Sequence, residues 1–103
     1  MRIVQNKRKR TDLDIIYEIL NALKNGPLPK TKLIYKANLA YVISQKYIPY
    51  LEEVGAIKKD NDLYYITSKG MEIHQLLGIY RSKVKEIKQI LDSLKEKIDD
   101  KNG

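Results

Sequence analysis

Apolar residues in the last third of the chain recur at alternating spacings of four and three positions, at Ile73, Leu77, Tyr80, Val84, Ile87, Leu91, Leu94 and Ile98. This is a heptad pattern, and it predicts one long helix with a coiled-coil seam. No proline interrupts the segment. A helix of about 30 residues spans about 45 Å, which is more than a small preceding domain covers. We therefore predict that residues 71–103 dimerise through these apolar side chains.

A shorter helix is predicted to start at Thr11 or Asp12, because threonine is a good N-cap and acids are favoured in a first turn. Gly26 should end it, and the prolines at 27 and 29 prevent its resumption. Helical spacing gives it an inward face of Leu13, Ile16, Ile19, Leu20 and Leu23.

Two further helices are expected over residues 30–37 and 40–54, separated by a break at Asn38. The inward residues of the first are predicted to be Leu33, Ile34 and Ala37. Those of the second are predicted to be Ile43, Tyr47, Leu51 and Val54, flanked by Ser44 and Tyr50.

Pro49 interrupts the third of these helices, where a proline removes a backbone hydrogen bond. Two interpretations compete. Either the helix starts late, near Ser44, so that the proline lies close to its first turn, or the helix bends there with the proline on the solvent side. We favour the second.

Residues 56–59 and 63–66 flank the polar sequence Asp60-Asn61-Asp62, which predicts a β-hairpin. One of Tyr64 and Tyr65 should be buried and the other exposed, because side chains alternate along a strand. Three helices, a hairpin and a final helix follow the order of a winged helix-turn-helix. The predicted fold is therefore mainly α (α+β), with a winged-helix DNA-binding domain at residues 11–70 followed by the coiled-coil helix.

The formal net charge is +7, and residues 1–10 carry five of the positive charges and no acid. A basic terminal block can act as a flexible arm on phosphate, or it can be a solubilising tail. The absence of cysteine excludes disulfides and cysteine zinc sites. The chain has no membrane-spanning apolar run and no apolar signal core at its start. We expect a cytoplasmic protein with a polyanionic partner and no membrane association.

Candidate DNA contacts follow from the predicted elements. Lysines on the second helix suit phosphate, Gln45 and Lys46 on the third helix can reach bases, and the wing can reach the backbone or minor groove. Glu52 and Glu53 argue against strong base-specific recognition. The candidate residues are Arg8, Lys9, Arg10, Lys30, Lys32, Lys36, Tyr41, Gln45, Lys46, Lys58, Lys59 and Asn61.

Three local sequences, NLAY (38–41), YIPYLEEVGAI (47–57) and YITSKG (65–70), together with the heptad tail, resemble the crenarchaeal 10a family of small basic chromatin-associated proteins. The resemblance covers residues 11–98. It implies a homodimer joined by an antiparallel coiled coil, with little sequence preference on double-stranded DNA. Some members also bind RNA. It also implies nucleoid association. Ala40 departs from the family pattern, which often has a capping serine there.

Three functions remain open: a largely sequence-independent DNA-binding dimer, a site-specific transcriptional regulator, and a winged-helix protein-interaction module. We favour the first. Enzyme activity is not expected, because His74 has no second histidine or cysteine with which to bind a metal and no phosphate-binding or nucleophile motif is present. No metal or other cofactor is expected.

Overall fold

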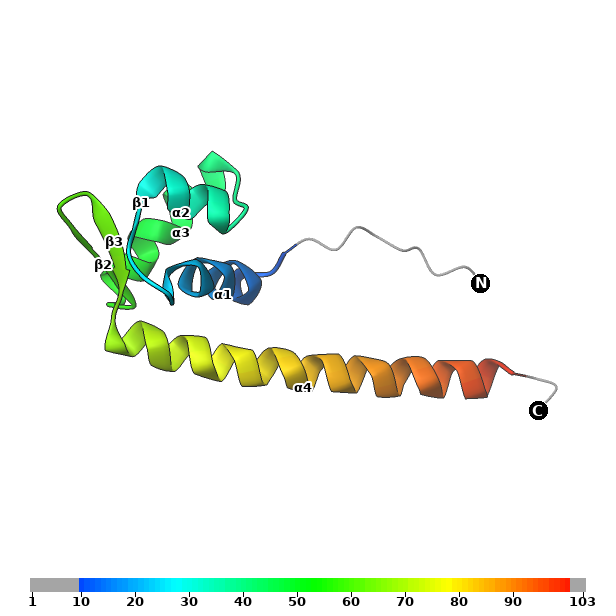
Figure 1. Cartoon of the computed structure of the whole chain (residues 1–103). Coiled ribbons are helices and arrows are strands. Elements are labelled where there is room, and N and C mark those ends of the chain that lie inside the picture. Colours follow the sequence, from blue (N-terminus) through cyan, green and yellow to red (C-terminus); the bar gives the residue numbers. More distant parts are fainter. Residues whose placement is uncertain (1–9, 101–103) are drawn as a thin grey trace.

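The computed structural model describes residues 10–100, and the elements are those of a winged helix-turn-helix followed by a long helix (Figure 1). In chain order they are α1 (Asp12–Leu23), β1 (Leu28–Pro29), α2 (Lys30–Lys36), α3 (Tyr41–Glu53), β2 (Ile57–Asp60), β3 (Leu63–Ile66) and α4 (Ser68–Asp99). The fold is mainly helical, as predicted.

Helix α1 begins where the sequence predicts. The Thr11 hydroxyl accepts from the amide of Asp14 at 3.1 Å, and the Asp14 carboxylate accepts from the Thr11 amide at 3.0 Å, which completes a capping box. The inward face was predicted only in part. Leu13 is 41% exposed and Ile16 is half-buried, whereas Ile15 and Ala22 are buried. The buried face is rotated because α1 packs against α4 as well as against α2, α3 and β3.

Helices α2 and α3 form the predicted helix-turn-helix. Asn38 has a φ of 56°, a left-handed conformation that ends α2. Leu33 and Ala37 are buried as expected, but on α3 Ile48 and Ser44 are buried while Val54 is only half-buried. The core residues of α2 and α3 lie with those of α1 in one cluster.

Helix α3 begins at Tyr41 and continues through Pro49, so the late start near Ser44 is wrong. Pro49 is exposed, as the favoured interpretation requires. A proline on the solvent side costs less than a buried one, because the Gln45 carbonyl that loses its partner amide lies on an exposed residue where water can reach it.

The sheet has three antiparallel strands in the order β1-β3-β2. The short strand β1, in which Leu28 pairs with Tyr64, was not predicted. Its proline lies on an edge strand, where a missing amide is tolerated. The turn between β2 and β3 holds only Asn61 and Asp62, with φ of 51° and 66°, which is the geometry of a type I′ hairpin.

Helix α4 is joined to the wing by Thr67. Its hydroxyl donates to the carbonyls of Gly55 and Ala56 at 2.6 and 3.0 Å and accepts from the Gly70 amide at 3.0 Å. A Cβ at Gly70 would lie 2.1 Å from the Ala56 carbonyl oxygen. Gly70 therefore allows α4 to leave the sheet at close backbone contact.

Gly70→Ala should lower the free energy of unfolding by about 1–3 kcal/mol, because the added methyl group forces backbone apart. Gly78→Ala on the same helix is the matched control. A Cβ there meets nothing within 4 Å, so the substitution should raise stability by up to about 1 kcal/mol through helix propensity. Urea unfolding measures both, and equal effects would contradict the close contact.

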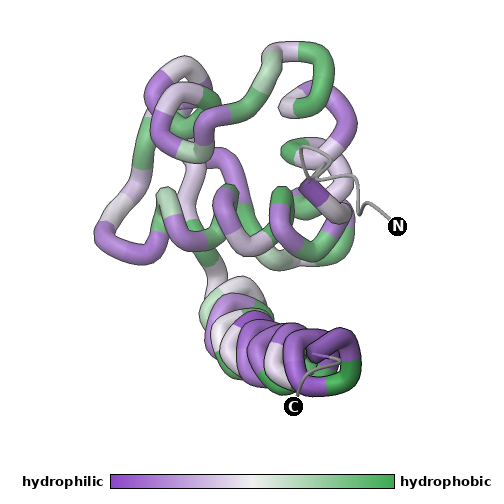
Figure 2. Tube along the Cα trace, turned by 90° about the vertical axis from the view of Figure 1, so that its right-hand side faces the viewer, coloured by the Kyte–Doolittle hydropathy of each residue, from purple (hydrophilic) through white to green (hydrophobic). Residues whose placement is uncertain are grey.

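The molecule is elongated, with extents of 64 × 26 × 20 Å. Helix α1 lies along the first part of α4, and the rest of α4 projects beyond the globular part (Figure 1). Viewed along α4, the helix lies beside the globular part (Figure 2). Leu77 is buried and Ile73 packs against the core. Two of the eight predicted seam residues therefore pack within the chain.

Candidate nucleic-acid interface

The side of α3 opposite the core is open to solvent. Ser44, Tyr47, Ile48 and Leu51 face inward, and the helix therefore turns a different set of side chains outward. These include Tyr41, Val42, Gln45, Lys46 and Pro49. Tyr50, expected to flank the inward face, is also exposed. In a helix-turn-helix the second helix enters the major groove and its N-terminal residues contact base edges. This face is the candidate groove-binding surface.

Helix α2, which precedes α3 in the helix-turn-helix, adds exposed positive charge. Lys30, Lys32 and Lys36 are all exposed, and the last two lie one turn apart on one side of the helix. Among residues 10–100, the salt bridge observed is Arg81–Asp14, so these lysines are not held in ion pairs with acids. Their ammonium groups can reach phosphate.

The wing is built of paired lysines and tyrosines. Lys58 lies across from Tyr65 and Lys59 across from Tyr64, with each ammonium nitrogen 5.8–5.9 Å from the ring centroid. Tyr64 is buried, as the alternation predicts, whereas Tyr65, which was expected to be exposed, is half-buried. Asn61 lies at the exposed tip between Asp60 and Asp62, which makes the tip of the wing locally acidic.

Two core tyrosines behind this surface have raised pKa values. The Tyr47 hydroxyl donates a hydrogen bond to the Asp12 carboxylate, and that bond, with burial and the carboxylate charge, raises the pKa of Tyr47. Burial and the charge of Glu52 raise the pKa of Tyr64. Both phenols therefore stay protonated at neutral pH and contribute no negative charge toward a polyanion.

Arg10 has a structural contact as well as a charge. Its guanidinium donates to the carbonyls of Ala37 and Asn38, in the turn between α2 and α3. Cations at a helix C-terminus stabilise the unpaired carbonyls there. Sequence reasoning placed Arg10 in a flexible arm and missed this contact, which spans 27 residues. The other two arm candidates, Arg8 and Lys9, lie outside the described residues.

A polar and aromatic cluster joins α1 to α4. The ring of His74 stacks on Tyr17 with centroids 4.9 Å apart, and its Nε2 lies 2.9 Å from the Asn21 amide oxygen. The Arg81 guanidinium also lies over the Tyr17 ring, 4.4 Å from its centroid, and binds the Asp14 carboxylate at 2.8 Å. Both side chains connect the long helix to α1 of the globular part.

Stability should fall as the pH drops below about 6.5. Burial and the nearby Lys24 ammonium lower the pKa of His74 from its ordinary value of 6.5. His74 in the folded state then binds a proton more weakly than in the unfolded chain. The free energy of unfolding is therefore highest above pH 6.5, where the histidine is neutral in both states, and decreases below it. Urea unfolding of wild type and His74→Gln between about pH 7 and about pH 5 tests this. Parallel curves for the two proteins would contradict it.

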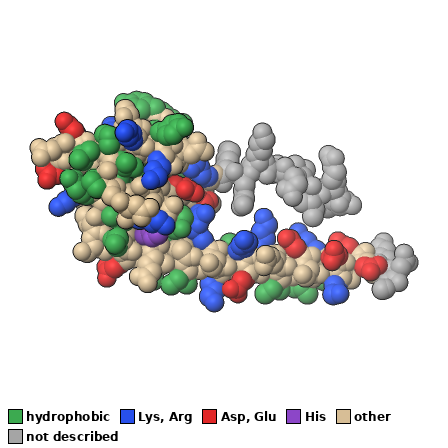
Figure 3. Space-filling model, in the orientation of Figure 1, with side chains coloured by type: hydrophobic (Ala, Val, Ile, Leu, Met, Phe, Trp, Pro, Cys, Tyr) green, Lys and Arg blue, Asp and Glu red, His purple; other side chains and the backbone are tan. Residues whose placement is uncertain are grey.

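The six remaining seam candidates are exposed on the projecting part of α4. Their exposed fractions range from 44% at Val84 to 74% at Ile98. Figure 3 shows hydrophobic side chains along the edge of this helix turned away from the globular part, interspersed with charged ones. Leu76 and Ile90 are exposed as well and were not predicted in the stripe.

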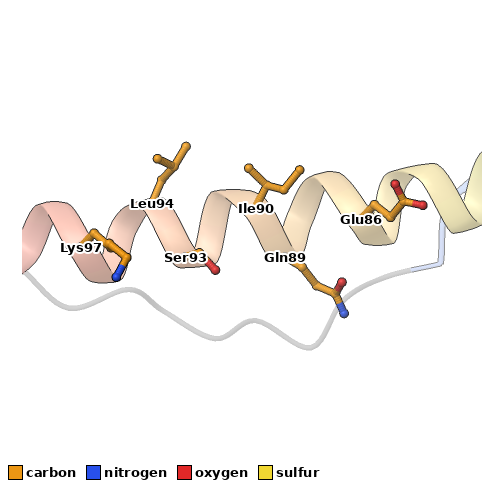
Figure 4. Close-up of a pocket in the computed structure, with 6 residues that line it drawn as sticks. All are labelled: Glu86, Gln89, Ile90, Ser93, Leu94 and Lys97. Atoms are coloured by element: carbon orange, nitrogen blue, oxygen red, sulfur yellow. The ribbon is translucent and has the colours of Figure 1, made fainter.

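A shallow groove runs along the same region of α4. Ile90 and Leu94 project together from one side of the helix, one turn apart, while Gln89, Ser93 and Lys97 lie toward the other (Figure 4). Within residues 10–100 no cluster of three or more histidines, cysteines or acids could hold a metal. No helix in the same range is long and apolar enough to cross a membrane.

This arrangement matches known proteins. A family profile described as winged helix-turn-helix matches residues 9–85. The chain belongs to this family. Among solved structures it resembles Sso10a-2, a DNA-binding protein from Sulfolobus solfataricus, at 34% identity and a TM-score of 0.64, over 86% of this chain and 93% of that one. The resemblance to the crenarchaeal 10a family is thereby confirmed.

Other matches of this winged helix-turn-helix protein extend the fold comparison. Ligand-free NadR shares the fold at 20% identity and a TM-score of 0.56, over 90% of this chain and 80% of that one. Two uncharacterized proteins of Methanocaldococcus jannaschii match over 60% and 71% of this chain, at 45% and 36% identity. The matches span 29% of the first relative and 76% of the second.

Proposed function

We propose that the protein is a homodimer that binds double-stranded DNA largely without regard to sequence and is associated with the nucleoid. The observation that carries the proposal is the position of the lysines. They are exposed on α2, which precedes α3 in the helix-turn-helix, and on β2, which packs against α3, while the exposed face of α3 itself offers few groups for base-specific hydrogen bonds. Affinity would then come mainly from phosphate contacts. The similarity to Sso10a-2 supports DNA as the partner.

The dimer is proposed from the projecting part of α4. An exposed apolar stripe from Tyr80 to Ile98 is rare on a monomer and is typical of an association surface. A second copy of the same helix supplies a matching stripe, so the heptad pattern can be satisfied by a two-stranded coiled coil. Arg81 of α4 is bound to Asp14 of α1. The globular part therefore covers one side of α4 as far as Arg81.

An antiparallel pairing places the two globular parts at opposite ends of the rod, where they do not compete for the same space. Each copy would then present its α2 lysines and its wing to a separate duplex. A stiff rod between two DNA-binding surfaces can bridge duplexes. This arrangement distinguishes an architectural protein from a regulator that places two domains on neighbouring half-sites.

A co-capture experiment tests bridging. One biotinylated duplex is immobilised, and a second, fluorescent duplex of unrelated sequence is added with the protein. We expect the fluorescent duplex to be retained by wild type and released by added salt, because both attachments depend on phosphate contacts. Gel shift on each duplex alone provides the control. Binding to single duplexes without co-capture would contradict the bridging arrangement and leave a coating mode.

A further inference from the structure

The outward ridge of α3 is unusually apolar for a surface expected to meet DNA. Val42, in the first turn, is 68% exposed. Pro49 is exposed seven residues later, and seven residues return a helix to the same side after two turns. Gln45 lies between them and is also exposed. The buried residues of the same helix lie on the opposite side.

Charge is sparse on this ridge. Lys46 is the cation beside Val42 and Pro49, and its ammonium lies 5.3 Å from the Tyr47 ring centroid. Glu52 and Glu53 lie at the far end of the helix, beyond Pro49. Exposed lysines lie on α2 and β2, the elements before and after α3 in the chain. An apolar strip with cations on neighbouring elements complements a major groove, whose floor carries thymine methyl groups between two rows of phosphates.

We propose that Val42 and Pro49 contact thymine 5-methyl groups in the major groove, which gives the protein a modest preference for A·T-rich duplexes. This rests on the proposed DNA-binding function. Seven helical residues span about 10 Å, which matches about three base steps of 3.4 Å. Gln45, between the two apolar residues, can pair with an adenine edge. Every A·T-rich sequence offers thymine methyl groups, so the protein would prefer a high A·T content and not a particular sequence.

Replacing thymidine by deoxyuridine removes the methyl group and leaves the phosphates and hydrogen-bonding edges unchanged. Wild type should bind a deoxyuridine duplex about three- to tenfold more weakly than the thymidine duplex, as expected for one or two lost apolar contacts. The salt dependence should be the same for both. In a G·C-rich duplex, 5-methylcytosine in place of cytosine should strengthen binding, because it restores a methyl group at the same place in the groove.

Val42→Ser should discriminate between the thymidine and deoxyuridine duplexes less than wild type does, because only the methyl contact of Pro49 remains. Its affinity for the deoxyuridine duplex should stay close to that of wild type. Met71→Ser, which removes an exposed apolar side chain from α4, should retain the discrimination. Equal binding of both duplexes by wild type would overturn the inference while leaving the proposed function standing. Failure to bind either duplex at low salt would overturn the proposed function instead. Loss of discrimination in Met71→Ser would also overturn the assignment to α3.

Discussion

Leu91→Asp should convert the protein from dimer to monomer. Leu91 lies near the middle of the exposed stripe of α4, and half of its surface is already open to solvent in the isolated chain. In a dimer the substitution would place two carboxylates in an apolar seam, where burying an unpaired charge is strongly unfavourable. The dissociation constant of the dimer should rise by a factor of at least about 100, which corresponds to about 3 kcal/mol.

Sedimentation equilibrium measures this change directly. Gln89→Asp is the matched control, because Gln89 lies on the same helix, outside the heptad seam, and gains the same charge. It should remain dimeric. The globular part of Leu91→Asp should stay folded, since Leu91 makes no part of its core, and circular dichroism checks this. A Leu91→Asp protein that remains dimeric would contradict the coiled-coil proposal.

Lys32→Glu combined with Lys36→Glu should weaken binding to every duplex by about the same large factor. Two phosphate contacts are replaced by two repulsions on the exposed side of α2. A loss of about 100-fold or more is expected at moderate salt, with a slope of log Kd against log salt that is shallower by about two. Fluorescence anisotropy over a salt series gives both quantities.

The control for this charge reversal is Lys85→Glu with Lys88→Glu. Both lysines are exposed on the projecting part of α4, so the net charge changes equally but away from α2. This variant should lose much less affinity, provided that it remains dimeric. An equal loss in the two double variants would mean that binding responds to total charge and would contradict a specific role for α2.

The sequence predicted the elements that depend on local chemistry. The Thr11 N-cap, the break at Asn38 and the polar hairpin turn each follow from a few adjacent residues, and all three are present. Strand β1 was missed because two residues carry no periodicity. Its pairing with Tyr64 is a long-range contact that no local pattern encodes.

The long helix shows a different limit. The heptad pattern correctly predicts a continuous helix, but it treats every apolar position alike. Leu77 is 7% exposed because α1 covers it, whereas Leu94 further along the same stripe is half exposed. Which positions the domain covers depends on how α1 packs across α4. Contacts such as Arg81 with Asp14, 67 residues apart, fix that packing.

The sequence predicted individual residues of the candidate DNA surface, but not how these residues are arranged together. The α2 and wing lysines are exposed as their spacing suggests, and Gln45 and Lys46 face outward. Pro49 was also predicted on the solvent side, but what its exposure and that of Val42 mean for DNA binding depends on the charge of the neighbouring elements. Arg10 was predicted as part of the flexible arm, but its guanidinium is bound to a carbonyl in the turn between α2 and α3.

The affinity of the wild-type protein for two unrelated duplexes of about 30 base pairs and equal A·T content, measured over a salt series, tests the central claim most directly. The proposal predicts dissociation constants within about threefold of each other and a slope of log affinity against log salt of about −3 or steeper. A preference of about 10³ for one duplex would indicate a site-specific regulator. Weak binding to both at low salt would contradict DNA as the main partner.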